Sequence, residues 1–551
     1  MTDPASQTSL EPNAKRAWLA PCAIVFVGVT ILLGCTIRTF GITTDEPVHI
    51  RNHAHAVRWL EGFSKHSIAE NLSKERLADG WRSGIEVNKN LPLPTFVSLF
   101  GYAVAGQFDS FPASFRWGNV FVFALACSVI FHWVRVRYST AAAAVALAAV
   151  LGNPRLFAHA NLLAVDTLVG CFWIFASWAL VNSRTNWRWA IAFGVLAGIG
   201  STVKPTFWFA GPMWVVWGLF NRPKELFKPF IGLFIIAPIT VVVFSPMWWT
   251  SPIGSFIDYM KMLGTDDTGW AIGTYYLGDI YQTATTESVP WHAVPVMTAI
   301  ATPLWILALA LIGGFQAIRN RSSTADDGML WLMSAVTLPL VCMLPNTPNH
   351  ESLRLFRSAF MFAPLLAAAG FESIRTLGRK AAITEAQRST WAWIPVAAIV
   401  ALAGWQTVRM HPGQLSFYNL SIGGLPGAAE NQKMPLGLPE RNRPRFEIAY
   451  WWAAMNEDAF TEMQTHIPEG ESLTIFPAHY GMELLREHGK FRDDIKLVYP
   501  ADQPNFILLY GRLGSLADPV AAPFASIFLH REPVWEKRID GVRVAALFQS
   551  Q

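Results

Sequence analysis

Charged residues are scarce in this chain, and so are cysteines. Only 15% of its 551 residues are charged, and the formal net charge is +4. The basic residues lie in short clusters without aromatic residues between them, which argues against nucleic-acid binding. All five cysteines fall in apolar stretches and lack metal-ligand spacing, so we interpret them as buried small hydrophobic residues. They are Cys22, Cys35, Cys127, Cys171 and Cys342.

Hydrophobic residues, in contrast, make up 52% of the chain, with 24 Trp and 37 Phe, which is typical of an integral membrane protein. A hydrocarbon layer of ~30 Å is crossed by about 20 apolar residues. The sequence contains eleven such runs, and the first is interpreted as a retained span because it lacks a convincing cleavage site. The runs are 17–40, 115–134, 139–160, 167–182, 187–203, 206–220, 228–247, 291–315, 329–345, 355–371 and 391–408.

A twelfth apolar run, 91–108, is short and begins with two prolines. If it lies along the membrane interface without crossing, five basic loops fall on one side together with Lys15 and Arg16. Because Lys and Arg accumulate in cytoplasmic loops, that side is predicted to be cytoplasmic. These loops are 135–138, 183–188, 221–228, 319–321 and 375–388.

This topology predicts a polytopic α-helical membrane domain over 1–410, in the cell membrane and with a cytoplasmic N-terminus. Residues 41–114 form its first exoplasmic loop, with interfacial helices. From His411 onward the apolar runs shorten and charges rise, which predicts an exoplasmic α/β domain over 411–551. Within it we expect a helix that begins after the N-cap residue Asn456 and runs through His466, and a hairpin at Asp540-Gly541. Strands are expected at 472–476, 495–499, 506–510, 534–539 and 542–548.

Four ionisable residues near the ends of spans gather on the predicted exoplasmic face. Asp45 and Glu46 follow the first span, Asp166 lies between two apolar segments, and Lys204 precedes Pro205. Charged side chains near spans are costly in the membrane and usually line a polar cavity or a substrate path. The alternative is that each is an ordinary polar residue at a helix end, facing water.

The order of these features along the chain resembles that of the GT-C glycosyltransferases. The resemblance is to the protein O-mannosyltransferase superfamily (glycosyltransferase family 39 type) and its bacterial relatives, which include the lipid A aminoarabinose transferases. It rests on the Asp-Glu pair, the later Asp, the Lys-Pro and an Arg-rich penultimate loop, and it covers nearly the whole chain. Three further collinear segments carry it: "YYLGDIYQTATTESVPWHAVPVMTAIATPLWIL" (275–307), "HESLRLFRSAFMFAPLLAAAG" (350–370) and "HPGQLSFYNLSIGGLPGAA" (411–429).

This resemblance implies an enzyme that moves a sugar from a polyprenyl-phosphate donor to an acceptor hydroxyl on the exoplasmic face, with inversion. Asp45 is expected to be the general base, because it matches the first acidic position of the family. Glu46 and Asp166 are expected to orient Asp45 or the acceptor and to stabilise positive charge at the sugar.

A phosphate leaving group needs cations or hydrogen-bond donors around it. The expected substrate-binding residues are Lys204, Arg354, Arg357, His350, Glu351 and Lys89. Arg354 ranks above Arg357 because it lies nearer the outer end of its helix. Lys89 is part of "NKNLPLP", where relatives often have His-Pro-Pro or Lys-Pro. The pair "WW" at 451–452 replaces a more usual Trp-Gly and has no interpretation from sequence.

Glu46, His49 and His53 form the pattern E-x-x-H-x-x-x-H, which would place all three on one face of a helix. Such a helix could hold a divalent metal or could simply be hydrated, and no cofactor is assigned. A transporter or lipid flippase is the alternative function, although its ionisable residues would sit nearer the middle of the membrane. An inactive relative that acts as a binding partner is a third possibility. The sugar, the acceptor, the carrier length, the oligomeric state and the role of the C-terminal domain stay open.

Overall fold

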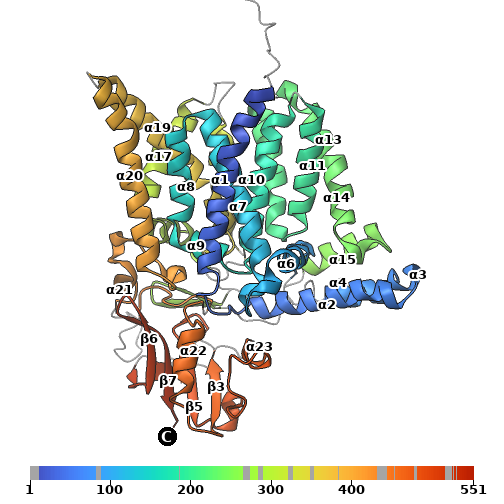
Figure 1. Ribbon diagram of the computed structural model, residues 1–551, viewed down its shortest axis with the longest axis vertical. Coiled ribbons are helices and arrows are strands. Elements are labelled where there is room, and N and C mark those ends of the chain that lie inside the picture. Colours follow the sequence, from blue (N-terminus) through green and yellow to red (C-terminus); the bar gives the residue numbers. More distant parts are fainter. Residues whose placement is uncertain are drawn as a thin grey trace, which may run out of the picture.

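The structure, a computed structural model, consists of a bundle of long helices with a β-sheet at one end (Figure 1). It describes residues 12–81, 89–184, 186–221, 223–264, 273–282, 289–320, 327–345, 347, 353–381, 384–430, 444–451, 453–476, 481–515, 524, 527–528 and 530–550.

Each of the eleven predicted apolar runs forms helix. The bundle consists of α1 (Pro12–Thr36), α7 (Trp117–Arg137), α8 (Thr140–Leu151), α9 (Pro154–Ala160), α10 (Val165–Ser183), α11 (Trp187–Ser201), α12 (Ala210–Asn221), α13 (Phe227–Ile231), α14 (Ala237–Val243), α16 (Ala293–Ala301), α17 (Leu304–Arg319), α18 (Gly328–Cys342), α19 (Ala363–Ala381) and α20 (Glu385–Arg409). The 3-10 segments η3 (Pro205–Phe209) and η7 (Arg357–Met361) precede α12 and α19, and the π-helical turn Gly232–Ile236 joins α13 to α14.

Among the described residues, four helices are long and apolar enough to cross a membrane, or up to six if each bent pair is one span. The bent pairs are α8 with α9, at 74°, and α16 with α17, at 119°. The sequence predicted both 139–160 and 291–315 as single spans, and the structure bends each of them. Each break falls next to a proline, at Pro154 and Pro303, where a helix tends to end because the preceding residue avoids the α conformation.

Glycine allows α17 and α19 to pack backbone against backbone. A Cβ added at Gly313 would collide with the carbonyl oxygen of Leu366, and a Cβ added at Gly370 would collide with that of Leu309. Small residues are common where membrane helices approach closely, since dispersion contacts drive their association. The pair Gly313 and Gly370 therefore sets the distance between these two helices.

Gly313→Ala is expected to destabilise the protein by about 1–3 kcal/mol, because the new methyl group has no room against the α19 backbone. The neighbouring Gly314→Ala is the matched control, since its Cβ would meet only the Leu332 side chain, at 3.4 Å. Both substitutions gain the same intrinsic helix propensity. Thermal unfolding in detergent measures the difference, and equal melting temperatures for the two variants would argue against the close approach.

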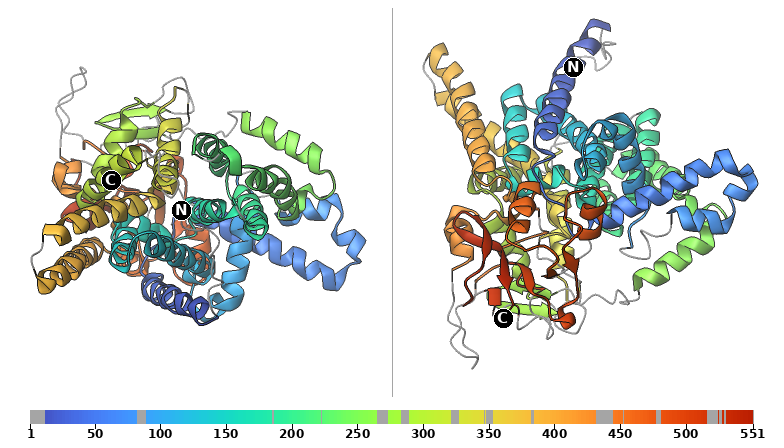
Figure 2. Two further views of the ribbon diagram at one scale, coloured as in Figure 1. Left: turned by 90° about the horizontal axis from the view of Figure 1, so that it is seen from above. Right: turned by 60° about the horizontal axis from the view of Figure 1, so that its bottom comes forward.

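Several helices lie across the end of the bundle nearest the sheet (Figure 1). They are α2 (Glu46–Lys65), α3 (Ile68–Asn71), α4 (Lys74–Trp81), α6 (Leu93–Val104) and α15 (Pro252–Gly264). The arm formed by α2, α3 and α4 projects beyond the bundle on the side of α15 (Figure 2). Helix α6, at 12 residues, rises only about 18 Å and is too short to span a hydrocarbon layer of ~30 Å.

The sheet has the strand order β4-β3-β5-β7-β6, with β3 parallel to β4 and β5, and β7 antiparallel to β5 and β6. Its strands are β3 (Ser472–Phe476), β4 (Lys496–Leu497), β5 (Phe506–Tyr510), β6 (Trp535–Ile539) and β7 (Val542–Gln549). These strands confirm the predicted ones, although β4 is shorter than expected. Asp540 and Gly541, with φ of 50° and 81°, make the predicted hairpin turn between β6 and β7.

Three further helices lie in the C-terminal part of the chain that the structure describes, and a separate hairpin before it was not predicted. The predicted Asn456 cap is confirmed, since its side chain accepts a hydrogen bond from the Ala459 amide at 3.2 Å. The helix that it caps, α22 (Glu457–Gln464), is two residues shorter than predicted. The other elements are α21 (Gly424–Ala428), α23 (Met482–Glu487) and the hairpin of β1 (Gly273–Tyr276) with β2 (Asp279–Gln282).

Candidate functional site

Four ionisable side chains from four separate segments meet in one cluster of ion pairs. Lys204 Nζ donates to Asp166 Oδ1 at 2.8 Å, and Arg354 Nε donates to Asp166 Oδ2 at 3.4 Å. A second nitrogen of Arg354, Nη2, forms an ion pair with Asp45. The structure thus brings together two of the three predicted catalytic acids and two of the predicted binding cations, and we refer to Asp45, Asp166, Lys204 and Arg354 as the ionic cluster.

Local structure places each member of the ionic cluster at the end of a helix. Asp45 immediately precedes α2, and Asp166 lies in the first turn of α10, where the helix dipole favours a carboxylate. Lys204 has an extended backbone just before Pro205 opens η3. Arg354 lies in the turn before η7. The four charged groups therefore lie at breaks between apolar helices, and none of them lies in the middle of a span.

The four side chains of the ionic cluster differ in their exposure to solvent, and this difference indicates which of them a substrate could reach. The Asp45 side chain is 25% exposed, whereas that of Asp166 is 2% exposed and is paired with both cations. Lys204 and Arg354 are partly accessible, at 15% and 18%. A reacting group could reach Asp45, whereas Asp166 is suited to hold the two cations in place.

Positive charge is in excess around the cluster. Arg357 is buried, with its guanidinium carbon 5.9 Å from the centre of the Trp451 ring. Burial, together with the positive charges of Arg357 and Arg512, lowers the pKa of Arg354 to about 9. The guanidinium still carries its charge at neutral pH, and among the residues that the structure describes here the cations Lys204, Arg354, Arg357 and Arg512 outnumber the anions Asp45 and Asp166. An added anion would therefore be stabilised there.

Of the remaining predicted binding residues, Lys89 is the one that the structure describes. Lys89 has a left-handed backbone, with φ of 57°, and its carbonyl accepts a hydrogen bond from the Tyr259 hydroxyl at 2.7 Å. That bond ties the segment of Lys89 to α15. His350 and Glu351 lie outside the described residues, so their predicted roles stay predictions.

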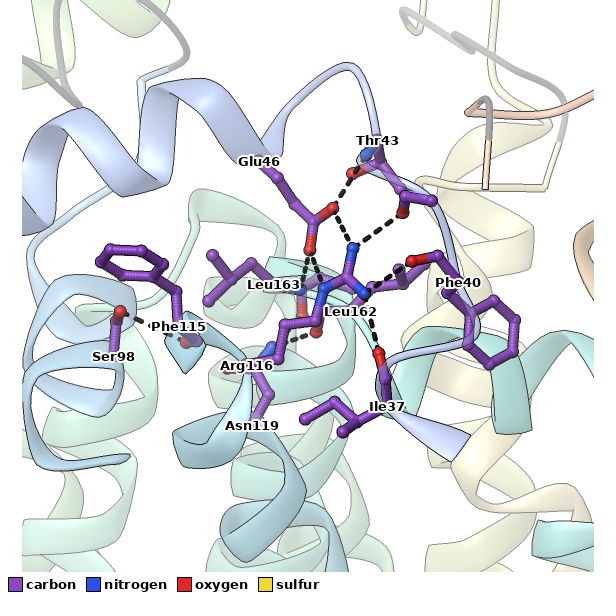
Figure 3. A network of polar contacts seen from close by, with 12 residues as sticks. Ile37, Phe40, Thr43, Glu46, Ser98, Phe115, Arg116, Asn119, Leu162 and Leu163 are labelled. Carbon is purple, nitrogen blue, oxygen red and sulfur yellow. Dashed lines mark hydrogen bonds and ion pairs between the residues drawn. The ribbon is translucent and has the colours of Figure 1, made fainter. Parts of the chain in front are cut away.

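Glu46 belongs to a separate buried network (Figure 3). Arg116 binds both of its oxygens, with Nε at 2.7 Å from Oε1 and Nη2 at 2.8 Å from Oε2. The backbone amides of Thr43 and Leu163 donate to the same carboxylate at 2.8 and 3.0 Å. Glu46 and Arg116 both have fully buried side chains. The Glu46 carboxylate thus holds three chain segments together, including the loop before Asp45, and its expected role in orienting Asp45 or the acceptor stays a prediction.

Arg116 is the residue that sequence reasoning missed. It also donates to the backbone carbonyls of Ile37, Phe40 and Gly41, at 2.9, 3.0 and 2.7 Å (Figure 3). These three residues form the loop between α1 and Asp45, so Arg116 shapes the approach to the ionic cluster. One signal could have found it: Arg116 is the second residue of the predicted span 115–134, at the end opposite to its basic loop, where Lys and Arg are uncommon.

The possible metal pattern on α2 does not assemble into a metal site. His53 Nδ1 lies 3.0 Å from Ser98 Oγ, and Glu46 is engaged by Arg116. Throughout the described part of the chain, no group of three His, Cys, Asp or Glu side chains could hold a metal ion. The two histidines are instead buried groups that pack α2 against the bundle.

Acid is expected to weaken this packing. Burial lowers the pKa of His49 and of His53 to about 4, and for His49 the charges of Glu46, Lys204 and Asp166 change the value less than burial does. Unfolded histidine binds a proton near pH 6.5, so between about pH 6.5 and 4 the unfolded chain holds more protons than the folded one. Stability should therefore fall as the pH drops through this window.

Unfolding free energies measured at several pH values test this expectation. The double variant His49→Gln, His53→Gln should lose much of the pH dependence between pH 6.5 and 4. The exposed His466 provides the control, because His466→Gln should keep the wild-type profile. An unchanged profile in the double variant would contradict the assignment to these two histidines.

The chain is similar to known proteins in part of its sequence and in its fold. A profile described as dolichyl-phosphate-mannose-protein mannosyltransferase matches residues 90–249, which include Asp166 and Lys204. No curated protein sequence matches the chain. Among solved structures, the chain is similar to apo ArnT from Cupriavidus metallidurans, with a TM-score of 0.50 and 11% identity, over 97% of this chain and 98% of that one.

Two further solved structures match with lower scores. ArnT from Cupriavidus metallidurans bound to undecaprenyl phosphate has a TM-score of 0.46 and 11% identity, over 96% of this chain and 98% of that one. The apo oligosaccharyltransferase of Archaeoglobus fulgidus also has a TM-score of 0.46 and 11% identity, over 91% of this chain and 66% of that one. The likeness to apo ArnT extends over nearly the full length of both chains, and on that basis this chain has the GT-C fold of ArnT.

Proposed function

We propose that this chain is an integral membrane glycosyltransferase that moves a sugar from a polyprenyl-phosphate donor to an acceptor hydroxyl on the exoplasmic face, with inversion. The ionic cluster carries the proposal, because it combines a reachable carboxylate with two cations that can bind a phosphate. The GT-C fold and the partial match to a dolichyl-phosphate-mannose-dependent family support it.

In the proposed orientation the eleven apolar segments cross the membrane and the sheet end faces the exoplasm. The start of α1 and the end of α19 lie at the end of the bundle away from the sheet (Figure 1). Lys15 and Arg16 belong to the start of α1, and Arg375, Arg379 and Lys380 belong to the end of α19. Basic residues favour the cytoplasmic side of a membrane. Residues 411–551 would then form an exoplasmic α/β domain over the active site.

The donor phosphate would bind to Lys204 and Arg354. Arg354 suits this task because a guanidinium can bind phosphate with two parallel hydrogen bonds. In the structure Asp45 occupies one side of this guanidinium. A phosphate that takes the place of Asp45 on Arg354 would therefore release the Asp45 carboxylate at the moment when the donor arrives.

The released Asp45 would act as the general base. The acceptor oxygen attacks the anomeric carbon, the bond from that carbon to the phosphate oxygen breaks, and the acceptor proton passes to Asp45. The phosphate leaves with the bonding electrons as an anion, stabilised by Lys204 and Arg354. Asp166 holds both cations throughout. Attack from the face opposite the phosphate inverts the configuration at the sugar carbon.

Turnover of labelled polyprenyl-phosphate sugars by the purified protein in lipid nanodiscs tests the proposal. At least one donor should release its polyprenyl phosphate, and Lys204→Met should slow that release by roughly 10²-fold, since it removes a cation from the leaving group. Lys65→Met is the control, because Lys65 is 65% exposed on α2. Failure to use any donor, together with equal affinity for undecaprenyl phosphate and undecaprenol, would refute the proposal.

A further inference from the structure

One aromatic residue from the C-terminal part of the chain lies directly on the ionic cluster. The Trp451 ring faces Arg354, whose guanidinium carbon is 4.3 Å from the ring centre. The ring also contacts His159 of α9, with 4.7 Å between the ring centres. Trp451 is 4% exposed, so these contacts are shielded from water.

The backbone of Trp451 is unusual for so large a residue. Its φ is 53°, in the left-handed region that bulky side chains rarely adopt. Such a conformation costs free energy and persists only where the surroundings hold it, which is often the case at functional sites. The contacts that keep Trp451 in this conformation are therefore relevant to its function.

The same segment holds the loop that carries Asp45. The Ala453 carbonyl accepts a hydrogen bond from the Gly41 amide at 2.9 Å. A Cβ at Gly41 would collide with the Met455 carbonyl, so the two backbones lie in direct contact. Trp451 thus contacts the Arg354 guanidinium, and residues 453 and 455 contact the loop that leads to Asp45.

We propose that Trp451 is a positioning residue for the donor phosphate, which it serves by holding the Arg354 guanidinium in the orientation seen in the ionic cluster. The face of an indole attracts a cation and so offsets the repulsion between Arg354 and Arg357, which lie over the same ring. The C-terminal segment thereby contributes an aromatic ring to a site in which all four members of the ionic cluster come from the preceding part of the chain. This inference rests on the proposed polyprenyl-phosphate donor.

The test compares the affinities for two lipids that differ only in the phosphate. Binding of undecaprenyl phosphate and of undecaprenol is measured for the wild-type protein, Trp451→Leu and Trp451→Phe in the same detergent. Trp451→Leu keeps an apolar side chain but removes the aromatic face, whereas Trp451→Phe keeps a face. The control is Trp405→Leu, because Trp405 pairs with Arg409 at 5.5 Å and is 52% exposed.

The wild type should bind undecaprenyl phosphate more tightly than undecaprenol. Trp451→Leu should weaken binding of undecaprenyl phosphate by about 5- to 30-fold and leave that of undecaprenol unchanged. Trp451→Phe should restore most of the loss, and Trp405→Leu should behave as wild type. A purely structural role would not separate the two lipids in this way.

Three results would overturn the inference while the proposed function stands. They are wild-type phosphate affinity in Trp451→Leu, an equal loss for both lipids, and no recovery in Trp451→Phe. A wild-type protein that binds the two lipids equally would instead refute the proposed donor, and with it the inference.

Discussion

Asp45→Asn is expected to reduce turnover about 10²- to 10⁴-fold, the contribution typical of a general base. Asparagine keeps the shape of the side chain but cannot accept the acceptor proton. It also removes the ion pair with Arg354, which frees this guanidinium for the donor phosphate. The affinity for undecaprenyl phosphate should therefore stay the same or increase while the rate falls.

Steady-state kinetics with a labelled donor, together with lipid binding, separate these two effects. Asp79→Asn is the control, since Asp79 is an acid on α4 that is 81% exposed. It should leave both quantities at wild-type values. Equal turnover in Asp45→Asn and wild type would remove Asp45 from the mechanism, whereas a joint loss of turnover and lipid binding would make it a structural residue.

Arg116→Met is expected to lower the free energy of unfolding by about 3–5 kcal/mol, because it leaves the Glu46 carboxylate buried without its cation. Three backbone carbonyls of the loop 37–41 lose their hydrogen-bond donor as well. Adding Glu46→Gln to Arg116→Met should recover part of the loss, since it removes the unpaired charge.

Chemical denaturation in detergent micelles measures these differences. Lys65→Met serves as the control, because Lys65 and Glu61 form an exposed pair on α2, and such pairs contribute about 0–1 kcal/mol. An Arg116→Met variant as stable as the Lys65→Met variant would show that the buried network does not hold the loop. No recovery in the double variant would assign the loss to the backbone carbonyls alone.

The positions of the helices could be predicted from sequence because a membrane imposes a simple length requirement on apolar runs. The sheet strands could be predicted from short runs rich in β-branched and aromatic residues, and the turn from the backbone freedom of Asp540 and Gly541. The proximity of the four residues in the ionic cluster could also be predicted, since each lies at the end of a predicted span on the same membrane face. Their roles in catalysis stay predictions.

Contacts between distant residues could not be predicted in the same way. Glu46 and Arg116 are 70 positions apart, and nothing local distinguishes a paired carboxylate from a reactive one. For that reason the adjacent Asp45 and Glu46 were expected to work together, although they belong to different networks. The left-handed backbone of Trp451 likewise depends on its contacts with segments far away in the sequence.

A cryo-electron microscopy structure of the protein in lipid nanodiscs with undecaprenyl phosphate tests the central claim most directly. The account predicts phosphate density within hydrogen-bonding distance of Lys204 and Arg354, with Asp45 released from Arg354 and Asp166 still paired. A phosphate bound elsewhere, with the Asp45–Arg354 pair intact, would contradict it.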